Sequence, residues 1–184
     1  MLDELLTLYP PDITQGSPYD TGTQNALTPE YKRIASILGD FVFQAPRRFF
    51  LNAVSDQQNG WSYCASHMLF LANMCRRSLT RGLSLTVSKR MKSLPFLGAA
   101  HGSDILNIYG GGDLTEFLIH FVTTMDPNCG SSPEWPRYTT SSPQLMTFLD
   151  SQGNSQVANR TITLDTYRTE GMEFLTNLSF ASPL

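Results

Sequence analysis

The clearest amphipathic pattern in the chain lies between residues 31 and 51. The apolar positions that recur there every three or four residues are Ile34, Ile37, Leu38, Phe41, Val42 and Ala45. Residues 28–30, Thr-Pro-Glu, supply a capping hydroxyl, a proline and an acid for the first turn. We therefore expect a helix with a buried apolar face, kinked or broken at Pro46 and continued by residues 47–51.

The other patterns predict shorter elements separated by segments rich in turn formers. Residues 10–28 are dense in such residues and are expected to run over the surface. Strand character is found at 61–63 and 143–150, and helical patterns cover 105–109, 114–125 and 166–178. This alternation predicts the α/β fold class, with too few strands for a complete parallel sheet.

The segment 95–104, which reads PFLGAAHGSD, carries the most informative chemistry. A short apolar run leads into a turn of small residues that presents His101, and an amphipathic segment follows. A histidine exposed where a strand gives way to a helix is well placed to shuttle protons. Gly98 and Gly102, which flank the turn, are expected to serve its backbone geometry.

Length, charge and cysteine content restrict the functional classes. The chain of 184 residues fits one domain, and its net charge of −3 provides no electrostatic footprint for nucleic acid. No apolar run is long enough for a transmembrane segment, and residues 1–11 lack the pattern of a secretory signal peptide. Cys64, Cys75 and Cys129 cannot all pair and lack metal-ligand spacing with a histidine, so neither a metal nor another cofactor is expected.

A series of short motifs runs in order along most of the chain. The motifs are Tyr9-Pro10, 15–19 (QGSPY), 31–33 (YKR), Gly39-Asp40, Arg47-Arg48, 61–63 (WSY), 95–104, 126–128 (DPN), Trp135-Pro136 and Tyr167-Arg168. Their order and spacing resemble the C-terminal part of the type-B carboxylesterases, most closely the fungal lipase branch. The resemblance implies an α/β-hydrolase fold, of which residues 1–184 would form a partial domain.

The same resemblance implies an activity and an origin. Members of the family cleave carboxylic esters, including acylglycerols in the lipase branch, and the full-length protein would be secreted. Glycosylation triplets at Asn159 and Asn177 favour the same origin. Because most of the family's sheet lies outside the matched region, the helix over residues 31–51 is expected to have little to pack against.

His101 matches the catalytic base of the family. That imidazole accepts the proton of a nucleophilic serine and returns it to the leaving alcohol. The sequence contains no Gly-x-Ser-x-Gly motif, and in the family the serine, the triad acid and the oxyanion loop precede this region. Asp40, Asp104 and Glu116 do not match the position of the triad acid. We therefore expect the chain alone to be inactive; the alternative is a non-catalytic binding or interaction remnant of the same fold.

Other polar residues fit structural roles. Asp104 is expected to cap the short helix after the histidine turn, or to pair with Arg47 or Arg48. The arginine pair equally fits a solvated run of charge. His67 has no motif around it, and His120 is expected at the surface or boundary of a helix.

Residues 64–87 depart from the family's spacing and are expected to be an insertion or a gene-model artefact. Residues 68–71 are apolar and lie near Arg76, Arg77 and Arg81, which fits a basic amphipathic helix that touches lipid. Translation of a retained intron is the preferred interpretation. It explains why the segment interrupts a strand and contains two of the three cysteines.

Overall fold

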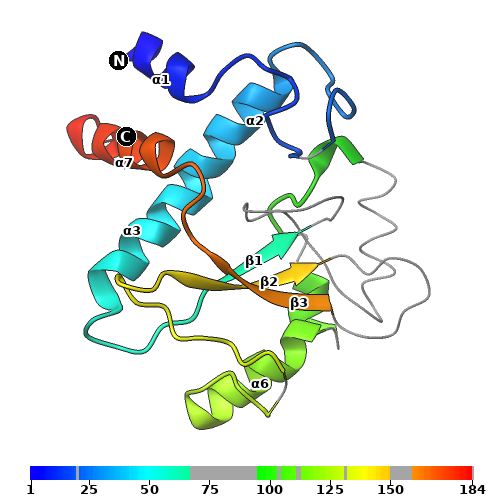
Figure 1. Cartoon of the computed structure of the whole chain (residues 1–184), viewed down its shortest axis with the longest axis vertical. Helices are drawn as coiled ribbons and strands as arrows, with labels where there is room; N and C mark the ends of the chain where they lie inside the picture. The colour runs from blue at the N-terminus through cyan, green and yellow to red at the C-terminus, as the bar shows by residue number, and fades with distance from the viewer. Residues whose placement is uncertain are drawn as a thin grey trace.

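A long helical rod, a small sheet and several shorter helices make up the architecture (Figure 1). The computed structural model describes residues 1–19, 21–66, 95–102, 105–110, 113–130, 132–149 and 159–183. The rod consists of α2 (Tyr31–Gly39), the π-helical η1 (Asp40–Gln44) and α3 (Ala45–Val54). Helix α7 (Thr169–Ala181) packs against η1 and α3, and α1 (Leu2–Leu8) packs against α7.

The rod confirms the predicted helix, but it begins at Tyr31 after Glu30 and has no side-chain cap, so the capping hydroxyl expected from Thr28 is wrong. The break expected at Pro46 does not occur either. A π-helical turn precedes the proline, and the Ala45 N–H donates to the carbonyl oxygen of Asp40. Pro46 then falls in the first turn of α3, where a missing N–H and a fixed φ are tolerated. The wider turn therefore lets the helix continue to Val54.

The rod buries only part of the predicted apolar face: Ala45 is buried, and Ile37 and Phe41 are half-buried. Ile34, Leu38 and Val42 are 51%, 55% and 51% exposed, and these three residues are called the outer stripe below. Lys32 and Asp40, on the other side, are 0% and 1% exposed. The prediction of a buried apolar face is thus wrong for the outer stripe. The expectation that this helix has little to pack against fits only this stripe, because Ala45 and Leu51 of the rod lie in a buried cluster.

The loop before α2 explains why polar residues are buried. The Lys32 ammonium donates to the Thr21 hydroxyl at 2.7 Å and to the carbonyl oxygens of Gly22 and Gln24 at 2.8 and 3.3 Å. The backbone carbonyls of a buried loop need hydrogen-bond donors. The loop therefore packs on the polar face of the helix, which supplies them. Gly16 allows the close approach, because a Cβ there would lie 2.6 Å from the Lys32 backbone.

The sheet in the described ranges has three strands in the order β1-β2-β3. The central strand β2 (Gln144–Leu149) runs parallel to β1 (Tyr63–Ser66) and antiparallel to β3 (Asn159–Leu164). This small mixed helix and sheet domain is compatible with the α/β class predicted from the sequence. Parallel pairing of β1 and β2 requires a crossover between them, and α6 (Asp113–Thr124) lies in that crossover.

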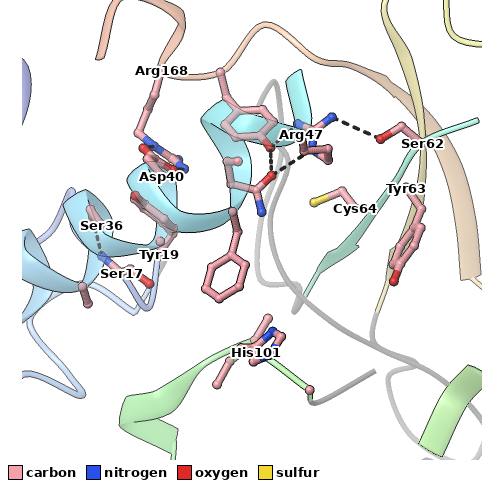
Figure 2. A pocket seen from close by; sticks show the side chains of 18 of the residues that line it. Ser17, Tyr19, Ser36, Asp40, Arg47, Ser62, Tyr63, Cys64, His101 and Arg168 are labelled. Atoms are coloured by element: carbon pink, nitrogen blue, oxygen red, sulfur yellow. Dashed lines mark hydrogen bonds and ion pairs between the residues drawn. The ribbon is translucent and has the colours of Figure 1, made fainter. Parts of the chain in front are cut away.

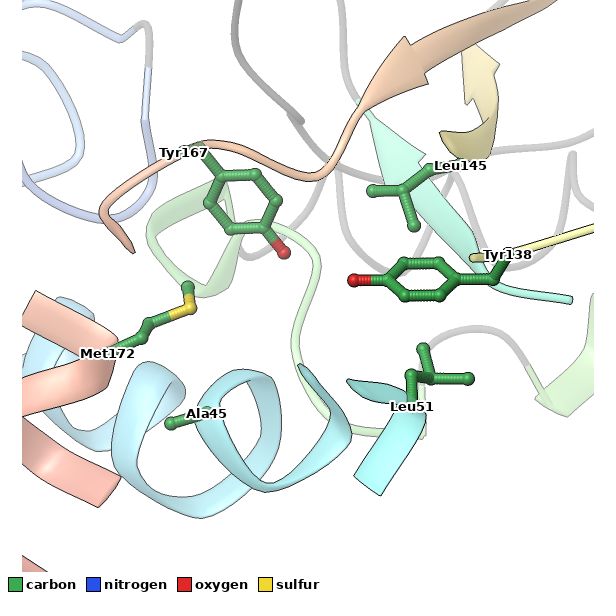
Figure 3. Packing of buried hydrophobic residues seen from close by; sticks show 6 residues of the cluster. All are labelled: Ala45, Leu51, Tyr138, Leu145, Tyr167 and Met172. Atoms are coloured by element: carbon green, nitrogen blue, oxygen red, sulfur yellow. The ribbon is translucent and has the colours of Figure 1, made fainter. Parts of the chain in front are cut away.

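Two apolar clusters lie on opposite faces of β2. Leu145 points toward the rod and joins the cluster of Ala45, Leu51, Tyr138, Leu145, Tyr167 and Met172 (Figure 3). Met146 and Phe148 belong to the second cluster, which includes Phe117 of α6 and Trp135. The rings of Phe117 and Trp135 meet edge to face at 5.2 Å, an arrangement that aromatic pairs prefer. Trp135 therefore packs in the core.

Most predicted elements are present, with shifted ends. The strand expected at 143–150 is β2, and the helices expected at 105–109 and 114–125 are α5 (Ile105–Tyr109) and α6. The last helix, α7, begins three residues later than predicted, after Arg168 with its left-handed φ of 43°. The segment before the histidine turn is a 3₁₀ turn, η2 (Pro95–Leu97), rather than the expected strand.

Two elements, α1 and β3, do not follow from the sequence patterns. Helix α1 is short and has no side-chain cap; the Arg33 guanidinium holds its end by donating to the carbonyls of Leu6 and Tyr9 at 2.8 and 2.5 Å. Strand β3 is polar on one face and forms through its hydrogen bonds with β2. In both, tertiary contacts decide the structure.

The segment 64–87 is described only at its start. Residues 64–66 continue β1, so the strand extends beyond the point where the sequence predicts an interruption. Residues 67–87, and His67 with them, lie outside the described residues. The interpretation of the segment as an insertion or gene-model artefact stays a prediction.

Candidate active site

A hollow of about 600 Å³ separates the rod from the loop that carries His101 (Figure 2). Its walls include Tyr19, Ser36, Asp40, Phe43, Arg47, Tyr63, His101 and Arg168. His101 lies across the hollow from Asp40 and Arg168 (Figure 2). The site thus combines a charged wall on the rod with a histidine on a loop.

His101 lies in a turn between two glycines with left-handed backbones. Gly98 has a φ of 58° and Gly102 a φ of 78°, which confirms their predicted role in the turn. The imidazole is exposed and stacks on the Phe43 ring, with ring centroids 4.8 Å apart and planes 19° apart. The prediction that His101 is presented at a solvent-accessible site is therefore confirmed in its geometry, while its catalytic role stays a prediction.

The histidine loop is attached to the start of the rod. The Tyr31 hydroxyl donates to the carbonyl oxygen of Phe96 at 2.8 Å, and the two rings meet edge to face at 6.4 Å. A Cβ at Gly98 would lie 2.9 Å from the Cβ of Pro18, so the loop also approaches the segment before α2 closely. These contacts hold the loop against the helix that supplies the opposite wall.

Asp40 and Arg168 form the centre of the charged wall. Two guanidinium nitrogens of Arg168 donate to the two Asp40 oxygens at 2.5 and 2.6 Å, and the Tyr9 hydroxyl donates to the same carboxylate at 2.9 Å. Burial, and then the negative charge of Asp40, raises the pKa of the Tyr9 hydroxyl above its ordinary value. The Arg168 guanidinium also lies over the Tyr19 ring, 4.4 Å from its centroid. Asp40 is therefore fully occupied in a structural pair.

Arg47 and Arg48 pair with a carboxylate that the sequence analysis does not single out, Asp165. Arg47 donates to both Asp165 oxygens at 2.8 and 2.9 Å, and Arg48 donates at 2.7 Å. Burial acts to raise the pKa of Asp165, but hydrogen bonds from the two arginines outweigh it and lower that pKa below its ordinary value. Burial and then the Asp165 charge raise the pKa of the nearby Tyr138 to about 12. The interpretation of the arginine pair as a solvated charge run is wrong.

The other candidate residues do not join His101. Asp40 points to Arg168, and Glu116 is exposed on α6. His120 is half-buried on α6, as predicted for a boundary residue. Asp104 lies outside the described residues. Across the described part of the chain, no hydrogen bond connects His101 to a carboxylate.

The motifs that carry the sequence resemblance meet one another in space. The Gly39-Asp40 motif meets Tyr167-Arg168 through the Asp40–Arg168 ion pair, over 128 residues of sequence. The Trp135 indole N–H donates to the carbonyl oxygen of Ser62 at 2.9 Å, which joins two further motifs. These motif residues therefore mainly stabilise the fold. The recurrence of Asp, Arg and Tyr in the motifs is the signal that could have predicted their pairing.

Neither a metal-ligand cluster nor a membrane-spanning helix occurs in the ranges described. No group of three or more His, Cys, Asp or Glu side chains gathers there as a metal centre would need. Among the described helices, none combines the length and apolar character required to cross a membrane.

Comparison with known proteins relates the chain to larger ones. No protein-family model matches it. It is 40% identical over 147 residues to Lipase 4 of Diutina rugosa, which covers 77% of this chain and 22% of that protein. It is 36% identical over 177 residues to Lipase 1 of Geotrichum candidum, with coverages of 93% and 26%. Identity to a secreted triacylglycerol lipase of Gibberella zeae is 31% over 183 residues, with coverages of 93% and 26%. The chain thus spans about a quarter of the length of these relatives.

Proposed function

Because this chain is homologous to fungal lipases over most of its own length, we propose that it supplies the histidine-bearing part of a carboxylic-ester hydrolase. In this proposal His101 is the general base. The observation that carries it is the exposure of His101 on a turn between Gly98 and Gly102, at the wall of the hollow. Homology extends across this region in relatives that match 93% of the chain.

The proposed role of His101 is a reversible proton transfer. One imidazole nitrogen accepts the proton of a serine hydroxyl as that oxygen attacks the ester carbonyl. The imidazolium then gives the proton to the leaving alkoxide, so that the alcohol departs neutral. Water repeats the sequence to release the acid. The serine, a carboxylate partner for the imidazole and the oxyanion donors are expected from sequence that the 184 residues do not contain.

Substrate class and location follow from the same proposal. The relative in Gibberella zeae is named as secreted and as a triacylglycerol lipase. We extend both properties to the whole protein of which this chain would be a part, with acylglycerols or other carboxylic esters as substrates.

The first experiment tests the chain alone. Purified chain 1–184 and its His101→Ala variant are expected to hydrolyse a short activated ester at the same background rate. The sequence has no Gly-x-Ser-x-Gly nucleophile, and without a nucleophile and oxyanion donors most of the rate enhancement is lost. Turnover that is stopped by a serine-directed inhibitor would contradict the expectation.

The second experiment restores the missing parts. In a chimera, this chain replaces the segment it matches in Lipase 1 of Geotrichum candidum. The chimera is expected to hydrolyse tributyrin, and His101→Ala is expected to lower its kcat by roughly 10³-fold or more. His120→Ala, which changes the half-buried histidine of α6, is the matched control and should retain activity. An active His101→Ala chimera would overturn the proposed role.

A non-catalytic binding remnant is the second candidate. The outer stripe favours it, because contiguous exposed apolar side chains mark interaction surfaces. In this case the chimera would be inactive although folded, with near-ultraviolet circular dichroism like that of the parent lipase.

A further inference from the structure

We propose that Phe43 is a positioning residue for His101, and that its ring sets the plane of the imidazole at the wall of the hollow. The proposal adds a second residue to the site and rests on the proposed function only for the catalytic consequence. The stacking itself is a property of the chain and can be tested without activity.

The geometry of the two rings supports this role. Their centroids are 4.8 Å apart and their planes differ by 19°, so the imidazole lies nearly flat on the phenyl ring. Stacking restrains the tilt of a ring and leaves its edges accessible, and the edges of an imidazole carry both nitrogens. In the part of the chain described, His101 has no hydrogen bond to a carboxylate that would orient it instead.

The backbone that carries Phe43 is fixed on both sides. Phe43 lies in η1, a π-helical turn of the kind frequently found at functional sites. Asp40 at the start of η1 is held by Arg168, and the Gln44 side chain at its end accepts hydrogen bonds from Tyr167 at 2.8 Å and Arg47 at 3.1 Å. The buried ion pairs thus serve the site indirectly, because they fix the turn that aims the Phe43 ring.

The loop on the other side is also anchored. Tyr31, at the start of the same rod, holds the carbonyl of Phe96 five residues before His101. Both rings of the stack are therefore held by one continuous helical segment, α2 and η1: Phe43 lies in it, and the loop of His101 is bound to it through Tyr31. Phe43 remains 43% exposed, so the stack is not explained by core packing. A change at Phe43 is also expected to leave the fold intact.

The first test uses chain 1–184 and measures the rate at which diethylpyrocarbonate modifies His101, followed by mass spectrometry of the peptide that contains it. Phe43→Leu is expected to raise this rate roughly two- to tenfold, the range that loss of an aromatic pair implies. Phe43→Tyr, which keeps the ring, is expected to retain the original rate. Phe49→Leu is the matched control, because Phe49 is an exposed aromatic of the rod that contacts Phe180 instead. An unchanged rate in Phe43→Leu would overturn the proposal.

The second test follows the imidazole directly. Cross-relaxation between the ring protons of Phe43 and His101 is expected in the original chain and in Phe43→Tyr. Its absence in the original chain would overturn the stack.

In the chimera with Lipase 1, Phe43→Leu is expected to lower kcat with little change in KM. The Phe43→Tyr chimera, which keeps an aromatic ring, is expected to retain the original kcat. If the His101→Ala chimera proves active, the proposed function fails, and the modification rates still decide whether Phe43 positions His101.

Discussion

The two faces of the helical rod differ in the opposite sense from an ordinary surface helix. The inner face buries Lys32, Asp40 and Arg48, whereas the outer stripe, defined above as Ile34, Leu38 and Val42, is about half exposed. A surface helix normally buries its apolar stripe and exposes charge. Periodicity alone therefore identifies a helix correctly and still places an exposed apolar stripe in the interior.

The two faces of the rod depend on different interactions. The charges of the inner face are buried with specific partners, and Asp40 receives hydrogen bonds from both Arg168 and Tyr9. A buried ion pair contributes little when complete, but removal of one member is strongly destabilising. The outer stripe has no such partners to lose, and an exposed apolar stripe is typical of a surface that another protein segment covers.

Asp40→Asn should produce the largest effect. It leaves the Arg168 guanidinium without its counter-charge, and the free energy of unfolding is expected to fall by about 3–5 kcal/mol. Urea denaturation followed by near-ultraviolet circular dichroism measures the change. Glu173→Gln, an exposed acid on α7, is the control and should stay within about 0.5 kcal/mol of the original protein. Equal stability of the two variants would show that the inner face does not depend on its ion pair.

Lys32→Met should have the next largest effect. The carbonyls of Gly22 and Gln24 and the Thr21 hydroxyl lose their buried donor, which is expected to cost about 1–3 kcal/mol. Hydrogen exchange should rise in the loop before α2 rather than in the sheet. Glu30→Met, at the exposed start of the rod, is the control and should leave the loop protected. A well-protected loop in Lys32→Met would contradict the assignment.

A smaller, pH-dependent loss is expected from Asp165. Its pKa is lowered in the folded protein, so its contribution to stability is present above the unfolded value of about 3.9 and disappears as pH falls through the folded value. The free energy of unfolding should therefore change little from this residue between pH 7 and about pH 5, and should fall at lower pH. Urea titrations at several pH values measure it. Asp165→Asn should flatten the acid limb, and an identical limb in both proteins would refute the linkage.

Substitution of the outer stripe should have the smallest effect on stability. Replacing Ile34, Leu38 and Val42 together by glutamine is expected to change the free energy of unfolding by no more than about 0.5 kcal/mol per site. Binding of a hydrophobic dye should nevertheless fall clearly, because the exposed apolar surface is removed. Leu145→Gln, in the core, is the contrasting control and should destabilise the protein strongly. Strong destabilisation by the stripe variant would mean that this face is buried after all.

The sequence by itself determined the local elements and the relationship to fungal lipases. A periodic segment specified the rod, small residues specified the turn at His101, and a short, mainly apolar run specified β2. These features depend on propensities and hydrogen bonds within a few residues, which a local pattern records. The motif series depends only on order along the chain, and the comparison with fungal lipases confirms the relationship that it predicted.

Only the tertiary structure decided which face of the rod is buried and which residues accompany His101. Asp165 meets Arg47 across 118 residues, and the Phe43 ring meets an imidazole carried by a separate loop. Such pairs depend on how distant segments pack, and a pattern of nearby residues contains no information about that. Burial also depends on what else covers a helix. For this reason an apolar stripe with a clear period lies exposed, while charged side chains that find partners elsewhere in the chain occupy the interior.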